Sequence, residues 1–165
     1  KESKWFLVES LLTSTNINFL YLLCEKKYCF ITAVFLSCDR IFRSETFMRI
    51  GLIGAGTVGG GVIDILELKS KSYKEELGLD LELACICAKS EEEVAPYKAR
   101  GYAVTTNANE MIKDPSIDVL VELAGGYEMP RKWITAALNE GKHVVTANKA
   151  LLAKYGHELY LVFLF

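Results

Sequence analysis

The sequence predicts an α/β protein with a doubly wound, mostly parallel sheet. Short apolar runs alternate with segments of helical period after residue 48, and the first run leads through a glycine-rich turn into a helical pattern. All twelve glycines and all three prolines lie at or after Gly51, whereas residues 1–47 contain neither. We therefore expect a folded domain over residues 48–165 and an N-terminal extension over residues 1–47.

The extension is rich in Phe, Leu, Ile, Tyr and Cys and differs in composition from the domain that follows. Its longest uncharged runs, residues 10–24 and 28–38, are shorter than the roughly 20 residues that a membrane-spanning helix needs. Its acidic residues argue against a transit peptide. We expect the extension to be helical or poorly ordered and not needed for function, with Met48 as the functional start. The alternative is a helical hairpin that covers the sheet edge.

The domain begins with an apolar run at residues 50–53, which we expect to be a strand. The pattern Gly54-x-Gly56-x-x-Gly59 follows, and a helical pattern then runs to Gly78. Strand, glycine turn and helix in this order form a dinucleotide-binding fingerprint. Gly54 allows a sharp turn, Gly56 the approach of a pyrophosphate, and Gly59 close packing of helix and strand. The N–H groups of the first helical turn would then bind the diphosphate, unless the turn carries no ligand.

The rest of the domain repeats the alternation of strand and helix. We expect strands at residues 81–87, 102–105, 118–124 and 143–146, and helices between Ser90 and Gly101, over residues 107–113, between Pro130 and Gly141, and from Ala150 onward. In such a sheet, ligands bind beyond the carboxyl ends of the strands. The loops at residues 54–59, 124–127 and 146–149 all lie there, so the sequence predicts one site formed by three loops.

The composition argues against several classes of partner. The chain has 19 basic and 21 acidic residues, so it has no electrostatic footprint for nucleic acid or an anionic membrane. The five cysteines form no Cys-x-x-Cys pair, and we assign no metal site. Cys85 and Cys87 are two apart on an expected strand, which indicates small core residues in a reducing, cytoplasmic compartment. We expect a small-molecule substrate as partner.

The end of the expected second strand indicates which dinucleotide is bound. NAD-selective domains usually place an Asp or Glu there, which hydrogen-bonds the 2′-hydroxyl of the adenosine ribose. This chain has Ala88-Lys89-Ser90, and its acidic residues begin at Glu91. Since a lysine can pair with a 2′-phosphate, we expect NADP. The alternative is that Lys89 is a solvated loop residue and that the chain accepts either cofactor, NAD included.

Two polar residues lie on expected strands. Glu122 is inside the apolar run 119–124, and a buried carboxylate must be paired, hydrogen-bonded or facing a cleft. We expect a structural hydrogen-bonding role for Glu122, with a role in the site as the alternative. His143 begins the fifth strand, at the end away from the expected site, so we expect a surface or edge residue rather than a base.

Three spaced motifs together resemble the NAD(P)-binding domain of homoserine dehydrogenases. They are residues 51–59, residues 121–126 and residues 142–153. The resemblance runs from about residue 49 to residue 159 and includes none of the family's substrate and dimerisation region. It implies a Rossmann-type fold and the reversible, NAD(P)H-dependent reduction of L-aspartate 4-semialdehyde to L-homoserine, on the route to threonine and methionine. It also implies a homo-oligomeric full-length form.

The resemblance assigns roles to individual residues, in addition to the three glycines of the turn. Thr57 and Val58 would contact the diphosphate, Lys89 the 2′-phosphate region, Ala124 and Gly125 the ribose side, and Thr146 and Lys149 the nicotinamide end. Lys149 is the candidate catalytic residue, because an ammonium can hydrogen-bond the carbonyl or alkoxide and a desolvated lysine can transfer a proton. The family's main acid-base lysine, its substrate-binding acids and its monovalent-cation site lie beyond the matching region.

The end of the chain departs from the family. The family continues into a polar helix and a further strand, whereas residues 159–165 are wholly apolar, so we expect a chain truncated before the substrate domain. Such a tail must pack on the domain, bind a partner or cause aggregation. We weigh three functions: the cofactor part of a homoserine dehydrogenase, a non-catalytic NADP-binding module, and a related dehydrogenase. We expect the full-length form to be active and these 165 residues to bind without turnover.

Overall fold

The computed structural model of the protein describes residues 5–11, 18–24, 30–36 and 46–164. The strands are β1 (Trp5–Leu11), β2 (Asn18–Cys24), β3 (Phe30–Leu36), β4 (Thr46–Ile53), β5 (Leu79–Cys87), β6 (Val104–Thr105), β7 (Val119–Glu122) and β8 (His143–Thr146). The helices are α1 (Thr57–Leu77), α2 (Glu91–Ala99), α3 (Ala108–Lys113), α4 (Glu128–Asn139) and α5 (Lys149–Leu164). All eight strands belong to one sheet with the order β1-β2-β3-β8-β7-β4-β5-β6.

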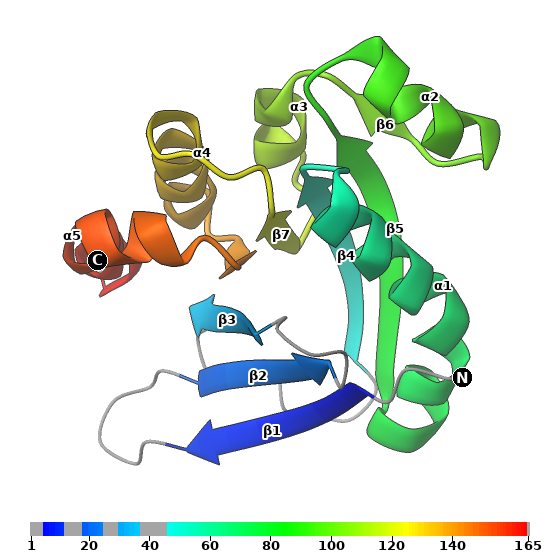
Figure 1. Cartoon of the computed structure of the whole chain (residues 1–165), viewed down its shortest axis with the longest axis horizontal. Coiled ribbons are helices and arrows are strands. Elements are labelled where there is room, and N and C mark those ends of the chain that lie inside the picture. Colours follow the sequence, from blue (N-terminus) through cyan, green and yellow to red (C-terminus); the bar gives the residue numbers. More distant parts are fainter. Residues whose placement is uncertain (1–4, 12–17, 25–29, 37–45, 165) are drawn as a thin grey trace.

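Five of these strands form the parallel core that the sequence predicts. β4 lies between β5 and β7, β6 lies beyond β5, β8 lies beyond β7, and each of these pairs is parallel. The connecting helices surround this part of the sheet, with α1 and α2 at one end of the strand order and α4 and α5 at the other (Figure 1). The predicted doubly wound, mostly parallel α/β class is confirmed.

The core is divided between the two faces of the sheet. Because successive strand residues point to opposite faces, Leu52 packs in a cluster with Ile63 of α1, whereas its neighbour Ile53 packs in a second cluster. That second cluster contains buried residues of α3, α4 and α5 and also Cys87. Burial raises the pKa of the Cys87 thiol to about 11, as expected for a core cysteine rather than a nucleophile.

Helix bounds follow local signals that the sequence carries. Gly78 ends α1 in the left-handed conformation, with φ of 67°, and its N–H donates to Lys74 O. Asn107 caps α3 by accepting a hydrogen bond from the Asn109 N–H. Pro130 lies in the first turn of α4, where its missing N–H costs nothing. The predicted positions of these helices are confirmed.

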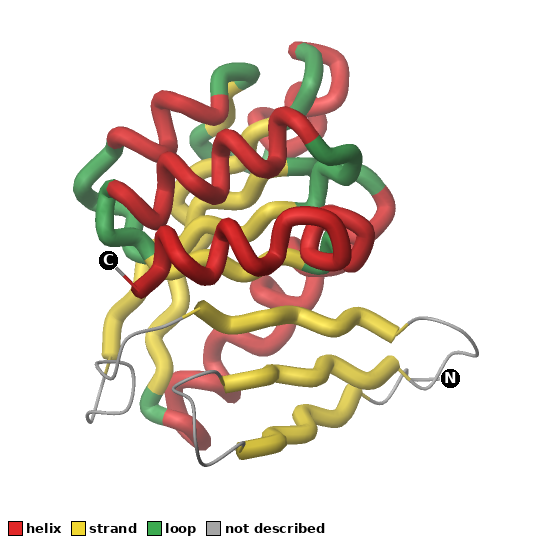
Figure 2. The backbone as a smooth tube through the Cα atoms, turned by 90° about the vertical axis from the view of Figure 1, so that its left-hand side faces the viewer, coloured by secondary structure: helices red, strands yellow, loops and turns green. Residues whose placement is uncertain are grey.

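The N-terminal extension differs from the prediction. Its described residues form β1, β2 and β3, which pair antiparallel side by side (Figure 2). β3 also pairs antiparallel with β8, from Val34 opposite Thr146 to Leu36 opposite Val144. The structure thus has strands here, where helices were one of the two forms expected, and the Phe, Tyr, Val and Ile residues of the sequence are types that favour strands. β4 begins at Thr46, two residues before Met48.

Residues 159–164 of the apolar segment belong to α5. Leu151 and Leu159 of this helix are buried in the core. The apolar segment that begins at Leu159 therefore packs partly on the domain, which is one of the three outcomes expected for it. Leu161 is 42% exposed. Within the described ranges, the structure contains no helix with both the length and the apolar character needed to cross a membrane.

Candidate functional site

The turn between β4 and α1 needs glycine at two positions, because a side chain at either would clash with the protein backbone. Gly54 has φ of +99°, and an added Cβ would lie 2.6 Å from the Ala124 backbone nitrogen. The Gly54 N–H donates to Cys87 O at 2.8 Å, which ties the turn to the end of β5. An added Cβ at Gly59 would lie 1.9 Å from Gly54 O, so α1 approaches the turn only because residue 59 has no side chain.

Gly56, at the N-cap of α1, has a different environment. An added Cβ at Gly56 would meet no protein atom within 4 Å, so protein packing does not require this glycine. Thr57 and Val58 follow in the first turn of α1 and are exposed, and first-turn N–H groups have no partner within their helix. Open space beside Gly56 and these amides fits the close approach of a diphosphate.

Glu122, at the end of β7, joins the second and third loops. Its side chain is fully buried, and Oε1 accepts hydrogen bonds from the Ala124 N–H at 2.8 Å and the Gly125 N–H at 3.3 Å. Oε2 accepts from the Thr146 hydroxyl at 2.7 Å. The predicted structural role of Glu122 is confirmed. Because these N–H groups and this hydroxyl proton are used internally, a ligand would contact Ala124 and Gly125 through their carbonyl groups and exposed surface.

Asn148 extends this network, although the sequence analysis gave it no role. Its Nδ2 donates to Gly126 O at 2.7 Å, and its Oδ1 accepts from the Leu151 N–H at 3.1 Å, which caps α5. Its own N–H donates to Thr146 Oγ1 at 3.1 Å. A single side chain thus fixes the loop after β7 to the start of α5. Since Asn is a preferred N-cap residue, its place between a strand and a helix was a usable signal.

The two candidate lysines, Lys149 and Lys89, follow the carboxyl ends of β8 and β5. Lys149 is exposed at the first residue of α5, directly beyond β8. Lys89 is exposed just beyond β5, and its backbone N–H donates to Glu93 Oε2 at 3.3 Å. The acidic group that the sequence places after the strand end therefore folds back beside Lys89, a contact that the sequence analysis missed.

The strand order sets these loops in a row. At the carboxyl edge of the sheet, Thr146 and Lys149 lie at the end of β8, and Ala124 and Gly125 follow β7. The glycine turn follows β4, and Lys89 follows β5. Adjacent strands lie about 4.8 Å apart. Neighbouring loops also contact one another. Asn148 is hydrogen-bonded to Gly126 in the second loop, Gly54 lies close against the backbone of Ala124, and the Gly54 N–H is hydrogen-bonded to Cys87 at the end of β5. The structure therefore brings the predicted residues to one edge of the sheet.

His143 lies at the opposite edge, at the amino end of β8. It is half-buried rather than fully at the surface, and this burial lowers the pKa of its imidazole below the usual value. The prediction that His143 lies away from the site is confirmed.

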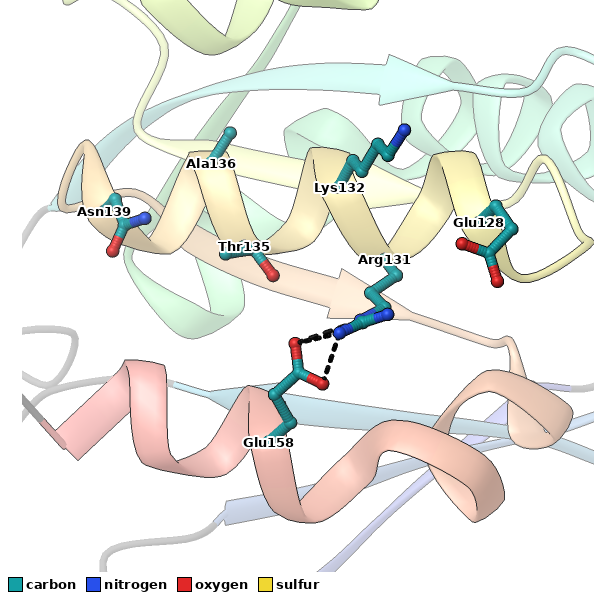
Figure 3. Close-up of a pocket in the computed structure, with 7 residues that line it drawn as sticks. All are labelled: Glu128, Arg131, Lys132, Thr135, Ala136, Asn139 and Glu158. Atoms are coloured by element: carbon teal, nitrogen blue, oxygen red, sulfur yellow. Dashed lines mark hydrogen bonds and ion pairs between the residues drawn. The ribbon is translucent and has the colours of Figure 1, made fainter.

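A separate open groove of about 390 Å³ lies between α4 and α5. Its lining residues are Glu128, Arg131, Lys132, Thr135, Ala136 and Asn139 of α4, and Glu158 of α5. Arg131 points from α4 towards α5 and forms an ion pair with Glu158 at 2.7 Å (Figure 3). Because the groove contains none of the predicted cofactor-binding residues, we place the candidate site at the carboxyl-edge loops.

The fold and the site define the nicotinamide-dinucleotide-binding domain of an oxidoreductase. A family model described as "Homoserine dehydrogenase, NAD binding domain" matches residues 54–163. The chain belongs to this family, and the predicted family and Rossmann-type fold are confirmed.

Individual relatives agree with this assignment. The chain is 37% identical over 112 residues to a homoserine dehydrogenase of Bacillus subtilis, a match covering 68% of this chain and 26% of that protein. It is 39% identical over 114 residues to one of Corynebacterium glutamicum, covering 67% and 24%. A solved homoserine dehydrogenase from Thiobacillus denitrificans matches with a TM-score of 0.68 and 36% identity, over 74% of this chain and 28% of that one. The chain thus spans about a quarter of the length of its relatives.

Proposed function

We propose that this chain is the cofactor-binding part of an enzyme that interconverts L-homoserine and L-aspartate 4-semialdehyde with NADP(H), on the route to threonine and methionine. The observation that supports this most is the row of loops at the carboxyl edge. From β8 to β5 it offers residues for the nicotinamide end, the ribose, the diphosphate and the adenosine ribose in the order in which a dinucleotide carries these groups.

The diphosphate binds at the glycine turn. Gly56 leaves room for the phosphate oxygens, and the N–H groups of Thr57 and Val58 donate to them at the positive end of α1. Gly54 and Gly59 act indirectly, because they let the turn and the helix approach each other. The Ala124 and Gly125 carbonyl groups face the ribose.

The adenosine end supports NADP as the preferred cofactor and NAD as an accepted one. The exposed ammonium of Lys89 pairs with a 2′-phosphate. The Glu93 carboxylate beside the Lys89 N–H offers an acceptor for a 2′-hydroxyl, which is the group that NAD presents.

The free thiols of Cys85 and Cys87 support a reducing, cytoplasmic location. The family resemblance supports a homo-oligomeric full-length form.

Lys149 is the proposed catalytic residue. The nicotinamide, when bound, donates or accepts the hydride. The Lys149 ammonium donates a hydrogen bond to the substrate oxygen, which stabilises the alkoxide as negative charge develops on it. Thr146 and Asn148 hold the loop that carries this lysine, because the Thr146 hydroxyl is bound to Glu122 and the Asn148 side chain to Gly126.

A Lys149→Ala change tests this role in a form that carries a complete substrate domain. We expect kcat for homoserine oxidation to fall by about 10²- to 10³-fold, with a much smaller change in NADP⁺ affinity. The matched control is Lys132→Ala, which removes an exposed lysine of α4 outside the site and leaves both quantities unchanged. Weaker cofactor binding with an unchanged kcat would remove the proposed role. For the 165-residue chain we expect cofactor binding without turnover.

A further inference from the structure

Tyr97 of α2 holds the glycine turn from outside it. The Tyr97 hydroxyl donates a hydrogen bond to Ala55 O at 3.1 Å, between residues 42 apart in sequence. The tyrosine is partly buried and packs against the cluster formed by α1 and the central strands. Tyr97, in α2, therefore contacts Ala55, which lies between Gly54 and Gly56 in the turn before α1.

This hydrogen bond fixes the orientation of one peptide unit. The Ala55 carbonyl and the Gly56 N–H belong to the same planar trans peptide, so they point in opposite directions. A hydroxyl that holds the carbonyl towards α2 turns the Gly56 N–H away from α2. The bond also polarises the peptide, which makes the Gly56 N–H a stronger donor.

Gly60 is explained by the same tyrosine. It lies outside the three-glycine pattern, and an added Cβ there would lie 3.3 Å from the Tyr97 hydroxyl oxygen, closer than most such contacts. A glycine at this position leaves room for the hydroxyl. At Gly61, by contrast, an added Cβ would meet nothing within 4 Å, although this residue also lies in α1.

We propose that Tyr97 is a positioning residue of the dinucleotide site, which aims the Gly56 N–H at the diphosphate through its hydrogen bond to Ala55 O. The inference rests on the proposed function. It adds a residue from α2, beyond the glycine motif, to the parts that build the diphosphate site.

Tyr102 offers a matched comparison. The Arg100 guanidinium lies over both rings, 5.7 Å from the Tyr97 centroid and 5.8 Å from the Tyr102 centroid. The Tyr102 hydroxyl, however, donates to Glu67 in α1 instead of to the turn. Removing the hydroxyl of either tyrosine therefore removes one hydrogen bond. Of these two hydroxyls, only that of Tyr97 is bonded to the peptide between Ala55 and Gly56.

The test is a fluorescence titration of the 165-residue chain with NADPH and with NADH. We expect Tyr97→Phe to weaken binding by about three- to ten-fold, as for one lost neutral hydrogen bond, and Tyr102→Phe to leave it unchanged. In ¹H–¹⁵N spectra without ligand, the Gly56 amide proton should move upfield in Tyr97→Phe and stay in place in Tyr102→Phe.

The two helix glycines give a second test. Alanine favours a helix over glycine at both positions, so both variants should keep or gain stability. We expect Gly60→Ala to weaken binding because the added methyl group displaces the Tyr97 hydroxyl, and to have no further effect in the Tyr97→Phe background. Gly61→Ala should bind as the unaltered chain does.

Unchanged affinity in Tyr97→Phe, or an equal loss in Tyr97→Phe and Tyr102→Phe, would overturn the positioning role while the proposed function stands. An unaltered chain that binds neither dinucleotide would overturn the proposed function and this inference with it. The shift of the Gly56 amide in spectra without ligand is independent of that result, so the two failures are distinguishable.

Discussion

Replacing Gly59 by alanine should abolish dinucleotide binding and destabilise the domain by about 3 kcal/mol, towards the upper end of the cost of overpacking. The added Cβ would lie 1.9 Å from Gly54 O, and a backbone oxygen cannot move away by changing a rotamer. α1 must therefore shift away from the turn, and its first-turn N–H groups move with it. Urea unfolding and titration with NADPH measure the two effects.

Gly61→Ala is the control for this change, since it adds the same methyl group to the same helix in open space. Its binding should be unchanged, and its stability should be equal or higher by up to about 1 kcal/mol. A Gly59→Ala chain that is as stable as the unaltered chain and binds NADPH equally well would show that α1 does not pack on the turn as described.

Replacing Glu122 by alanine produces the second large effect. The carboxylate accepts from the Ala124 and Gly125 N–H groups and from the buried Thr146 hydroxyl, and all three donors would lose their partner. Leaving a buried donor unsatisfied costs about 1–3 kcal/mol, and two of these donors are only partly buried. We expect a loss of about 2–4 kcal/mol in the free energy of unfolding, together with weaker dinucleotide binding.

Glu122→Gln separates the hydrogen bonds from the charge. Glutamine keeps the length of the side chain and one oxygen for the two N–H groups, and the Thr146 hydroxyl can accept from its amide nitrogen. We therefore expect a smaller loss than for alanine. Glu128→Ala is the control: this exposed carboxylate accepts one hydrogen bond, from the Tyr155 hydroxyl at 3.3 Å, and lies in the first turn of α4, so its loss should cost at most about 1 kcal/mol. A Glu122→Ala chain as stable as the unaltered one would contradict the role of this carboxylate in joining the loops.

Local patterns explain why much of the domain was predictable. The strand before Gly54, the helix that Gly78 ends and the Asn107 cap each follow from residues adjacent in sequence. The carboxyl-edge site followed from the same alternation, because parallel strands end at one edge. Glu122 was identifiable because a carboxylate inside an apolar run needs partners.

Contacts between distant residues explain what was missed. Tyr97 and Ala55 are 42 residues apart, and Asn148 and Gly126 are 22 apart, so no local pattern records either hydrogen bond. The sequence does not predict the strands of the extension, because residues 1–47 contain no glycine or proline to mark the turns between them. β3 also pairs with β8, which is more than 100 residues away in sequence.

The central claim is that a nicotinamide dinucleotide binds with its diphosphate beside Gly56. Calorimetric titration of the unaltered chain and of Gly56→Ala with NADP⁺ and NAD⁺ tests it most directly. An alanine at residue 56 meets no protein atom within 4 Å, and its φ of −71° is open to any residue, so the change should cost no more than about 1 kcal/mol, the penalty of alanine as the N-cap of α1. We predict that the unaltered chain binds both dinucleotides, NADP⁺ more tightly, and that Gly56→Ala binds at least about ten-fold more weakly because its methyl group occupies the space of the phosphate oxygens. Equal binding by the two chains, or binding of neither dinucleotide by the unaltered chain, would contradict the account.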